Sequence, residues 1–153
     1  MSPKVLPALC TTHPLPLRRN SGQRILQWVL VSVEVLISAG AMYGGVGLID
    51  HDRVGISADW LTATPFTNWV WPGIFLLLIV AVPMLLAAMA ETFRLRWAYW
   101  LTILAGAAQV GWIVVQWFIM GRFFVLQPVM LAAGAVVMLL GWLVHRGGRP
   151  DGR

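Results

Sequence analysis

The sequence has little charge and almost no cysteine. Only 11% of its 153 residues are charged, whereas 59% are hydrophobic, and a soluble domain of this size carries charge on about a quarter of its residues. The single cysteine, Cys10, excludes a disulfide within the chain and any redox centre built from paired cysteines. These shortages exclude an ordinary soluble domain and indicate one domain embedded in a membrane.

Ionisable residues are also missing from the apolar runs of the chain. These runs contain no His and no Cys, and Glu34 is their only acid. A metal centre, or a nucleophile with its base, cannot be assembled from such runs, so we expect no enzymatic activity, no catalytic residue, no metal and no cofactor. The cluster Asp50-His51-Asp52 has ligand-type side chains. Because no further His or Cys lies nearby, we interpret it as the polar end of a helix.

The apolar residues form four runs, separated by polar connections. At about 1.5 Å per residue the first three exceed the ~30 Å hydrocarbon core of a bilayer, and the fourth is at the short end for a span. We predict an all-α integral membrane four-helix bundle over residues 25–144. Residues 1–24 and 145–153 are basic and rich in proline or glycine, and we predict a disordered arm and a disordered tail. The predicted spans are residues 25–49, 70–90, 97–120 and 128–144.

The positions of Lys and Arg predict the orientation. Nine of the eleven lie in the N-terminal arm, the connection 91–96 and the tail, and only Arg53 and Arg122 lie in the other connections. Under the positive-inside rule both termini are cytoplasmic, and the protein is a multi-pass protein of the inner cell membrane. Basic residues that lie in short clusters between spans do not form a groove-reading module, so we expect the lipid bilayer and no nucleic acid as partner.

Two further features concern the segments next to the first span. The basic start, the apolar residues 25–37 and the small residues 38–41 imitate a cleavable signal peptide, although Glu34 inside that short apolar core argues against cleavage. The outer connection 50–68 carries a capping Ser57 and the dipeptide Thr64-Pro65. Together with Phe66, Trp69 and Trp71, it is predicted to form a short interfacial helix.

Polar residues within the spans predict which faces point inward. On a helical projection of the first span one narrow face carries Gln27, Glu34, Ser38, Ala41 and Gly45. Glycine at two positions four residues apart, Gly40 and Gly44, forms a second face with the small-xxx-small spacing of close helix contacts. This second spacing fits either packing within the chain or a homodimer seam.

The third span has a polar stripe of its own. Thr102, Gln109 and Gln116 repeat every seven residues, with Ala105 on the same face. Side-chain amides facing lipid would lack hydrogen-bond partners, so we expect this stripe to point into the bundle.

The polar groups of the first and third spans are predicted to lie at similar depth. Counted from the predicted helix starts, Glu34 lies at about 14 Å and Gln109 at about 18 Å. Pro83 removes a backbone donor from the second span, which predicts a kink and a free carbonyl at Ile79 in the same layer. The candidate intramembrane polar site therefore comprises Glu34, Ser38, Gln109 and Gln116. Two interpretations stay open: hydrogen bonds that fix helix register, or the handling of protons or a ligand.

Several short patterns resemble known membrane proteins. An acid in the first of four spans, here Glu34, is similar to the small multidrug-resistance transporters, but those chains are shorter, have tight loops and include members without this basic bias. Across most of its apolar region the chain resembles a loose group of small uncharacterised four-span bacterial membrane proteins, which implies the fold and membrane location and no particular reaction. The patterns are Gly44-Gly45, Thr64-Pro65-Phe66, Pro72-Gly73, Gln109, Gln116 and Gln127-Pro128.

From these observations we expect an accessory or scaffold component of a membrane assembly, with a membrane-protein partner or a second copy of the chain. The alternative is a proton-linked small-molecule transporter, or a protein that binds an apolar ligand or lipid, using Glu34.

Overall fold

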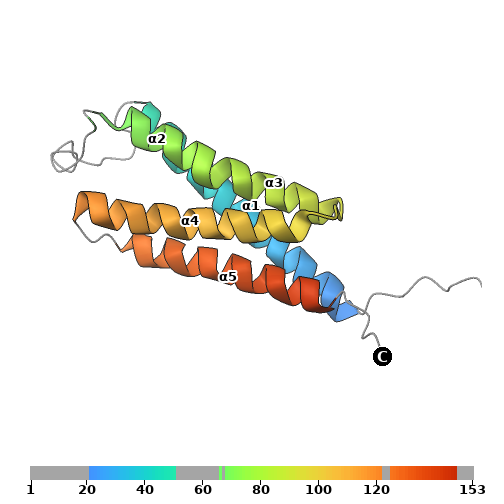
Figure 1. The fold of residues 1–153 in the computed structure, drawn as a ribbon. Coiled ribbons are helices and arrows are strands. Elements are labelled where there is room, and N and C mark those ends of the chain that lie inside the picture. The colour runs from blue at the N-terminus through green and yellow to red at the C-terminus, as the bar shows by residue number, and fades with distance from the viewer. Residues whose placement is uncertain (1–20, 51–65, 67, 122–124, 148–153) are drawn as a thin grey trace, which may run out of the picture.

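The chain folds into four long helices, as seen in a computed structural model that describes residues 21–50, 66, 68–121 and 125–147 (Figure 1). Three consecutive elements, α2, η2 and α3, join into one helical rod, Val70–Thr92. Each rod is long and apolar enough to cross a membrane. The predicted all-α fold with four spans is thus confirmed. The elements are α1 (Ser21–Ile49), α2 (Val70–Leu76), η2 (Leu77–Ala81), α3 (Val82–Thr92), α4 (Ala98–Met120) and α5 (Leu126–Gly147).

The first and last helices are longer than the sequence suggested. Residues 21–24 and 145–147, expected in a disordered arm and tail, belong to α1 and α5. His145 and Arg146 lie in the last turn of α5, where a basic side chain interacts favourably with the helix dipole. The 22 residues of α5 make about 33 Å, a comfortable span. The rest of the arm, the rest of the tail and the expected interfacial helix lie outside the described residues.

The four rods form a bundle in which α1 and α4 lie on one diagonal. α1 packs against α2, η2, α3 and α5, whereas α4 packs against η2, α3 and α5. Figure 1 shows α1 running obliquely behind the other helices. The start of α1, the α3–α4 turn and the end of α5 lie at one end of the bundle, and the end of α4 and the start of α5 lie at the other.

The second rod is irregular just before Pro83. Leu77–Ala81 is a π-helical segment, and the N–H of Val82 donates to the carbonyl of Leu77, five residues back. Pro83 follows in the first turn of α3. A proline cannot donate a backbone hydrogen bond and crowds the preceding turn, and a single wide turn relieves that crowding. The interruption expected from Pro83 therefore takes the form of a π-helical turn.

Left-handed residues end α3 and α4. Arg94 has φ 54° and Gly121 has φ 59°. After α3, the N–H of Leu95 donates to the carbonyl of Ala90 at 2.9 Å, and the N–H of Arg94 donates to that of Glu91 at 3.2 Å. This pair of bonds is a Schellman motif. It reverses the chain within a few residues, so α3 and α4 are antiparallel neighbours.

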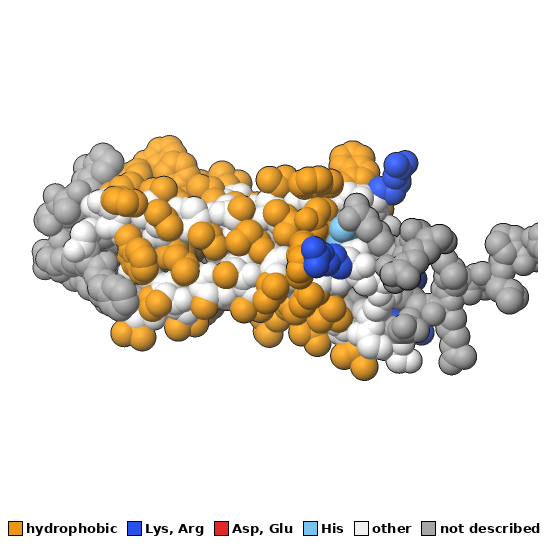
Figure 2. All heavy atoms as spheres, turned by 60° about the horizontal axis from the view of Figure 1, so that its bottom comes forward, with side chains coloured by type: hydrophobic (Ala, Val, Ile, Leu, Met, Phe, Trp, Pro, Cys, Tyr) orange, Lys and Arg blue, Asp and Glu red, His pale blue; other side chains and the backbone are white. Residues whose placement is uncertain are grey.

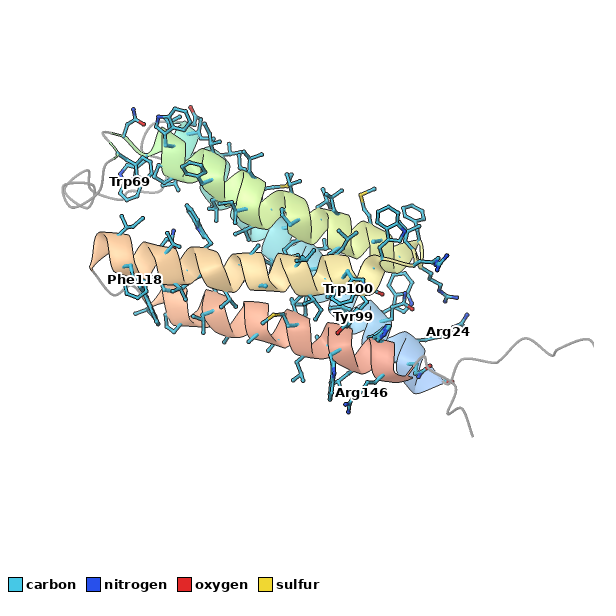
Figure 3. All side chains as sticks on the ribbon, viewed as in Figure 1. Arg24, Trp69, Tyr99, Trp100, Phe118 and Arg146 are labelled. Atoms are coloured by element: carbon cyan, nitrogen blue, oxygen red, sulfur yellow. The ribbon has the colours of Figure 1, made fainter. Side chains whose placement is uncertain are left out.

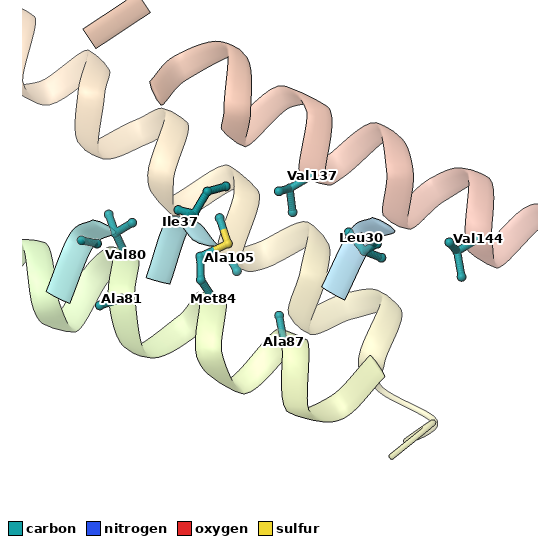
Figure 4. Packing of buried hydrophobic residues seen from close by; sticks show 10 residues of the cluster. Leu30, Ile37, Val80, Ala81, Met84, Ala87, Ala105, Val137 and Val144 are labelled. Carbon is teal, nitrogen blue, oxygen red and sulfur yellow. The ribbon is translucent and has the colours of Figure 1, made fainter. Parts of the chain in front are cut away.

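The interior combines small, aliphatic and polar side chains, whereas large apolar side chains cover the outside. Small residues such as Ala81, Ala87 and Ala105 lie in the buried cluster with Leu30 and Met84 (Figure 4). Hydrophobic side chains extend along the length of the face in Figure 2. This distribution is the reverse of a soluble core and matches helix packing in lipid. Of the seven largest fully buried side chains four are polar: Glu34, Ser38, Thr102 and Gln109.

Candidate intramembrane polar site

The polar face of α1 lies inside the bundle. Its five residues are all buried in the structure, and Glu34 has no exposed surface: Gln27, Glu34, Ser38, Ala41 and Gly45. Their spacing of three, four or seven residues keeps them on one side of a helix. The rotation of α1 about its axis therefore follows from the sequence pattern.

Glu34 reaches across the centre of the bundle to α4. The hydroxyl of Thr102 donates to Oε1 of Glu34 at 2.9 Å, and both side chains are fully buried. Because α1 and α4 lie on a diagonal, this bond joins two helices that have few direct backbone contacts. Within the described part of the chain, Oε2 of Glu34 has no hydrogen-bond partner.

Glu34 lies in the half of the bundle that contains the basic end. Its partner Thr102 is about 6 Å along α4 from the first residue, Ala98. Gln27, about 10 Å before Glu34 on α1, donates through Nε2 to the carbonyl of Glu91 at 2.5 Å, at the end of α3. Both measures place Glu34 in the basic-end half.

The predicted depth match between Glu34 and Gln109 is therefore corrected. Gln109 lies about 10 Å further along α4 than Thr102, so Glu34 is level with Thr102 instead. The estimate from sequence assumed that α1 and α4 start at the same level. In the structure α1 begins at Ser21 and runs obliquely across the bundle, which shifts every residue on it relative to α4.

Ser38 holds the π-helical turn of the second rod. Its hydroxyl donates to the carbonyl of Ala81 at 2.9 Å, and its side chain is 2% exposed. Ala81 is the last residue of η2. The sequence pointed to the carbonyl of Ile79 as the group freed by Pro83. The polar contact of this region falls two residues later, where the wide turn has changed the backbone register.

The stripe on α4 is only partly interior. Gln109 is 1% exposed and donates through Nε2 to the carbonyl of Met130 in α5 at 2.6 Å, while its Oε1 has no partner among the described residues. Gln116 is half-buried and thus less enclosed than Gln109. A straight α-helix drifts about 20° per seven residues. Over the two intervals from Thr102 to Gln116 this drift turns the stripe by about 40°, which moves Gln116 partly away from the centre.

The two glycines singled out from the sequence differ in their surroundings. A Cβ built on Gly40 meets no atom within 4 Å among the described residues, whereas one built on Gly44 lies 3.5 Å from Cδ2 of Leu76. Gly40 thus makes no close contact with another described helix, because its side of α1 faces outward. Packing within the chain, one of the two interpretations left open by the spacing, is found only at Gly44. Gly44 makes an ordinary contact.

The closest helix approaches use other glycines. A Cβ on Gly73 would lie 2.7 Å from the carbonyl oxygen of Gly45, where α2 crosses α1. Gly106 of α4 and Gly134 of α5 face each other in the same way, with distances of 3.0 and 3.1 Å from each built Cβ to the other residue's carbonyl oxygen. A single glycine without a second one four residues away has no recognisable packing motif in the sequence. Such a glycine can be predicted to face inward only because it shares a helix face with polar or small residues.

Further contacts between side chains lie at the end opposite the arginines. The indole N–H of Trp117 donates to Oε1 of Gln127 at 2.6 Å. The ring of Phe75 lies 6.1 Å from that of Trp112 and 6.3 Å from that of Trp71. The ring contact joins α2 to α4, and the hydrogen bond joins α4 to α5. Sequence analysis had assigned no role to the Trp117–Gln127 pair.

The arrangement defines a four-helix membrane bundle whose buried polar groups bond from one helix to another. Within the described residues, no three His, Cys, Asp or Glu side chains come together as a metal site. Comparison with protein-family models, with curated proteins and with solved structures finds no match to this chain. Any account of function therefore rests on the geometry itself.

Proposed function

We propose that this chain is a multi-pass protein of the inner cell membrane that serves as an accessory or scaffold component of a larger membrane assembly. The observation that carries the proposal is the use of the interior polar groups as cross-links between helices. Glu34, Ser38 and Gln109 are at most 2% exposed, and each bonds to a different helical element. A closed, cross-linked interior favours a fixed bundle that acts through its outer surface.

The cross-links differ in partner and in position along the bundle. A hydrogen bond between helices in a membrane contributes roughly 0.6 to 2 kcal/mol, and several bonds at different levels fix both rotation and register. They join α1 to α3 (Gln27 to Glu91), α1 to α4 (Glu34 with Thr102), α1 to η2 (Ser38 to Ala81) and α4 to α5 (Gln109 to Met130).

The proposal includes an orientation with both termini in the cytoplasm. Within the described residues all four arginines lie at one end of the bundle: at the start of α1, in the α3–α4 turn and at the end of α5. That distribution follows the positive-inside rule. Reporter fusions after Arg153 and within residues 50–59 are expected to report opposite compartments. An external signal from the fusion at Arg153 would contradict the orientation.

The scaffold role is tested by extraction in native-lipid discs through a tag on the chain. We expect a stoichiometric membrane partner, or a second copy, to be retained. Glu34→Gln, which keeps the interior hydrogen bond, should retain the partner. Tyr43→Ala changes an exposed side chain and tests whether that part of the outer surface contacts the partner. Recovery of the parent chain alone as a monomer would refute the scaffold role.

Proton-linked transport, or binding of a ligand in the interior, is the second candidate. It is supported by two buried acceptors without partners among the described residues, Oε2 of Glu34 and Oε1 of Gln109. They are separated by about 10 Å along the bundle, and buried acceptors favour the binding of a proton or a donor. In proteoliposomes, proton flux that is lost in folded Glu34→Gln would favour this candidate. Flux that is absent from both the parent and Glu34→Gln would exclude proton-linked transport.

A further inference from the structure

Among the described residues, the basic end of the bundle displays positive charge without exposed negative charge. Arg24, Arg94, Arg96 and Arg146 are all exposed there, and basic side chains appear at this end in Figure 2. Among the described acids, Glu91 is 6% exposed and Glu34 is fully buried, while Asp50 follows the far end of α1. An anionic partner at this end would therefore meet no described carboxylate.

The start of α4 and the end of α5 form an ordered corner at this end. The ring of His145 stacks on that of Tyr99, with centroids 4.2 Å apart and planes at 22°, and the ring of Trp100 lies 5.2 Å from that of Tyr99. The guanidinium of Arg146 lies 3.8 Å above the ring of Trp142. We call these residues the α4–α5 corner: Tyr99, Trp100, Trp142, His145 and Arg146. Figure 3 labels Tyr99, Trp100 and Arg146 there.

Stacking leaves the binding edge of Arg146 available. A guanidinium attracted to an aromatic ring lies over the ring face, while its N–H donors point outward in the plane of the group. Those donors form a rigid fork that matches the two oxygens of a phosphate. Arg146 is exposed, and among the described residues no acid pairs with it. The cation is held in place while its hydrogen-bond donors remain free.

The corner also lies at the level where lipid headgroups are found. Trp100 is 64% exposed and Trp142 is 37% exposed, both within one or two turns of a helix end. Exposed tryptophans at the ends of spans mark the membrane–water boundary. Arg146, one turn beyond Trp142, is therefore at the level of the phosphates, and the two indoles are at the level of the glycerol and upper acyl chains.

We propose that the α4–α5 corner binds the headgroup of an anionic phospholipid. The phosphate accepts hydrogen bonds from Arg146, and the acyl chains lie against Trp100 and Trp142. Charge complementarity and the membrane level of the corner both favour a lipid over a soluble anion. The inference concerns the chain alone and is independent of whether it acts as a scaffold or a transporter.

The test uses the full chain in phosphatidylcholine nanodiscs, with or without phosphatidylglycerol. Native mass spectrometry measures which lipid stays bound when the disc is removed. The parent is expected to retain phosphatidylglycerol preferentially. In Arg146→Gln this preference should fall about tenfold or more, because the charge-assisted hydrogen bonds of the fork are lost together with the charge. Trp142→Leu should lower it as well, because the guanidinium is then no longer held.

The matched control is Arg24→Gln, which removes the same charge at the same end but outside the corner. It should lower the preference by at most about fivefold, the effect of one surface arginine on an anionic lipid, and Arg146→Lys, which keeps the charge without the planar fork, should lie between parent and Arg146→Gln. Equal losses in Arg24→Gln and Arg146→Gln would mean that the arginines of this end attract anionic lipid together and that the α4–α5 corner is not a specific site. Displacement of the lipid by glycerol phosphate would assign the corner to a soluble anion. Unchanged preference in folded Arg146→Gln would overturn the proposal.

Discussion

Gly45 and Gly40 lie five residues apart on the same helix and in opposite surroundings. A Cβ on Gly45 would come within 2.7 Å of Leu77 and 3.1 Å of the carbonyl of Gly73, whereas a Cβ on Gly40 meets no described atom within 4 Å. Gly45 shares its face of α1 with the buried residues Glu34 and Ser38. Gly40 lies on the face that is exposed.

The contrast shows which sequence signal sets helix rotation in this bundle. Gly40 and Gly44 have the spacing associated with close helix packing, yet the tight contact is made by the glycine on the polar face. A polar group facing lipid costs more than a missing van der Waals contact, so the polar residues decide which way α1 turns. The small residues on that same face then permit close approach.

The difference in packing between the two faces of α1 is tested by adding a larger side chain on each face in turn. Gly73→Val places a branched side chain where even a Cβ would meet the Gly45 carbonyl. Overpacking of this kind costs about 1 to 3 kcal/mol, and more when backbone must move. We expect the largest loss of stability here, measured by unfolding of the purified protein in detergent.

The control for that change is Gly40→Val, which should remain within about 0.5 kcal/mol of the parent. If Gly40→Val destabilises the chain as much as Gly73→Val, the two faces of α1 are not different. If it leaves the monomer stable but dissociates a dimer, the outward glycine face is a seam between two copies.

The second prediction concerns the buried hydrogen bond between Glu34 and Thr102. Glu34→Ala removes a buried side chain and leaves the hydroxyl of Thr102 without its acceptor, which costs about 1 to 3 kcal/mol. Glu34→Gln retains an acceptor and should stay close to the parent. A double-mutant cycle with Thr102→Val is expected to show coupling between the two positions. Additive effects would mean that the bond across the diagonal does not contribute.

Much of the fold could be predicted from sequence because it depends on single helices. The four apolar runs gave the number of spans, and the spacing of Glu34 and Ser38 gave the inward face of α1. The predicted end of the third span at residue 120 agrees with the end of α4, which the left-handed Gly121 follows. Each of these features is set within one helix by length, periodicity or a local backbone requirement.

The pairing between helices could not be predicted in the same way. Thr102 bonds to Glu34, although the sequence matched Glu34 with Gln109 by depth. That pairing depends on how far α1 slides and tilts relative to α4, and periodicity within a helix carries no such information. The Gly45–Gly73 and Gly106–Gly134 approaches depend on the same two variables. The π-helical turn added a register change that moved the polar contact of this region to Ala81.

The third prediction compares two amides of α4 that have the same chemistry. Gln109→Leu removes a buried amide that bonds to α5 and should cost about 0.6 to 2 kcal/mol. Gln116→Leu changes a half-buried side chain near the far end and should have little effect on the melting temperature in detergent. A larger loss in Gln116→Leu would show that the interior stripe extends about two turns further than the structure places it.

The smallest expected loss of stability comes from removing a single buried hydroxyl of α1. Ser38→Ala removes the bond to the carbonyl of Ala81, worth about 0.6 kcal/mol if it resembles the average bond between membrane helices. Ser32→Ala removes the same hydroxyl from an exposed position one and a half turns earlier and should leave stability unchanged. Because both changes share the same helix and the same gain in helix propensity, their difference isolates the contact with the π-helical turn. Equal stability of the two variants, measured by reversible unfolding in detergent, would show that Ser38 does not hold that turn.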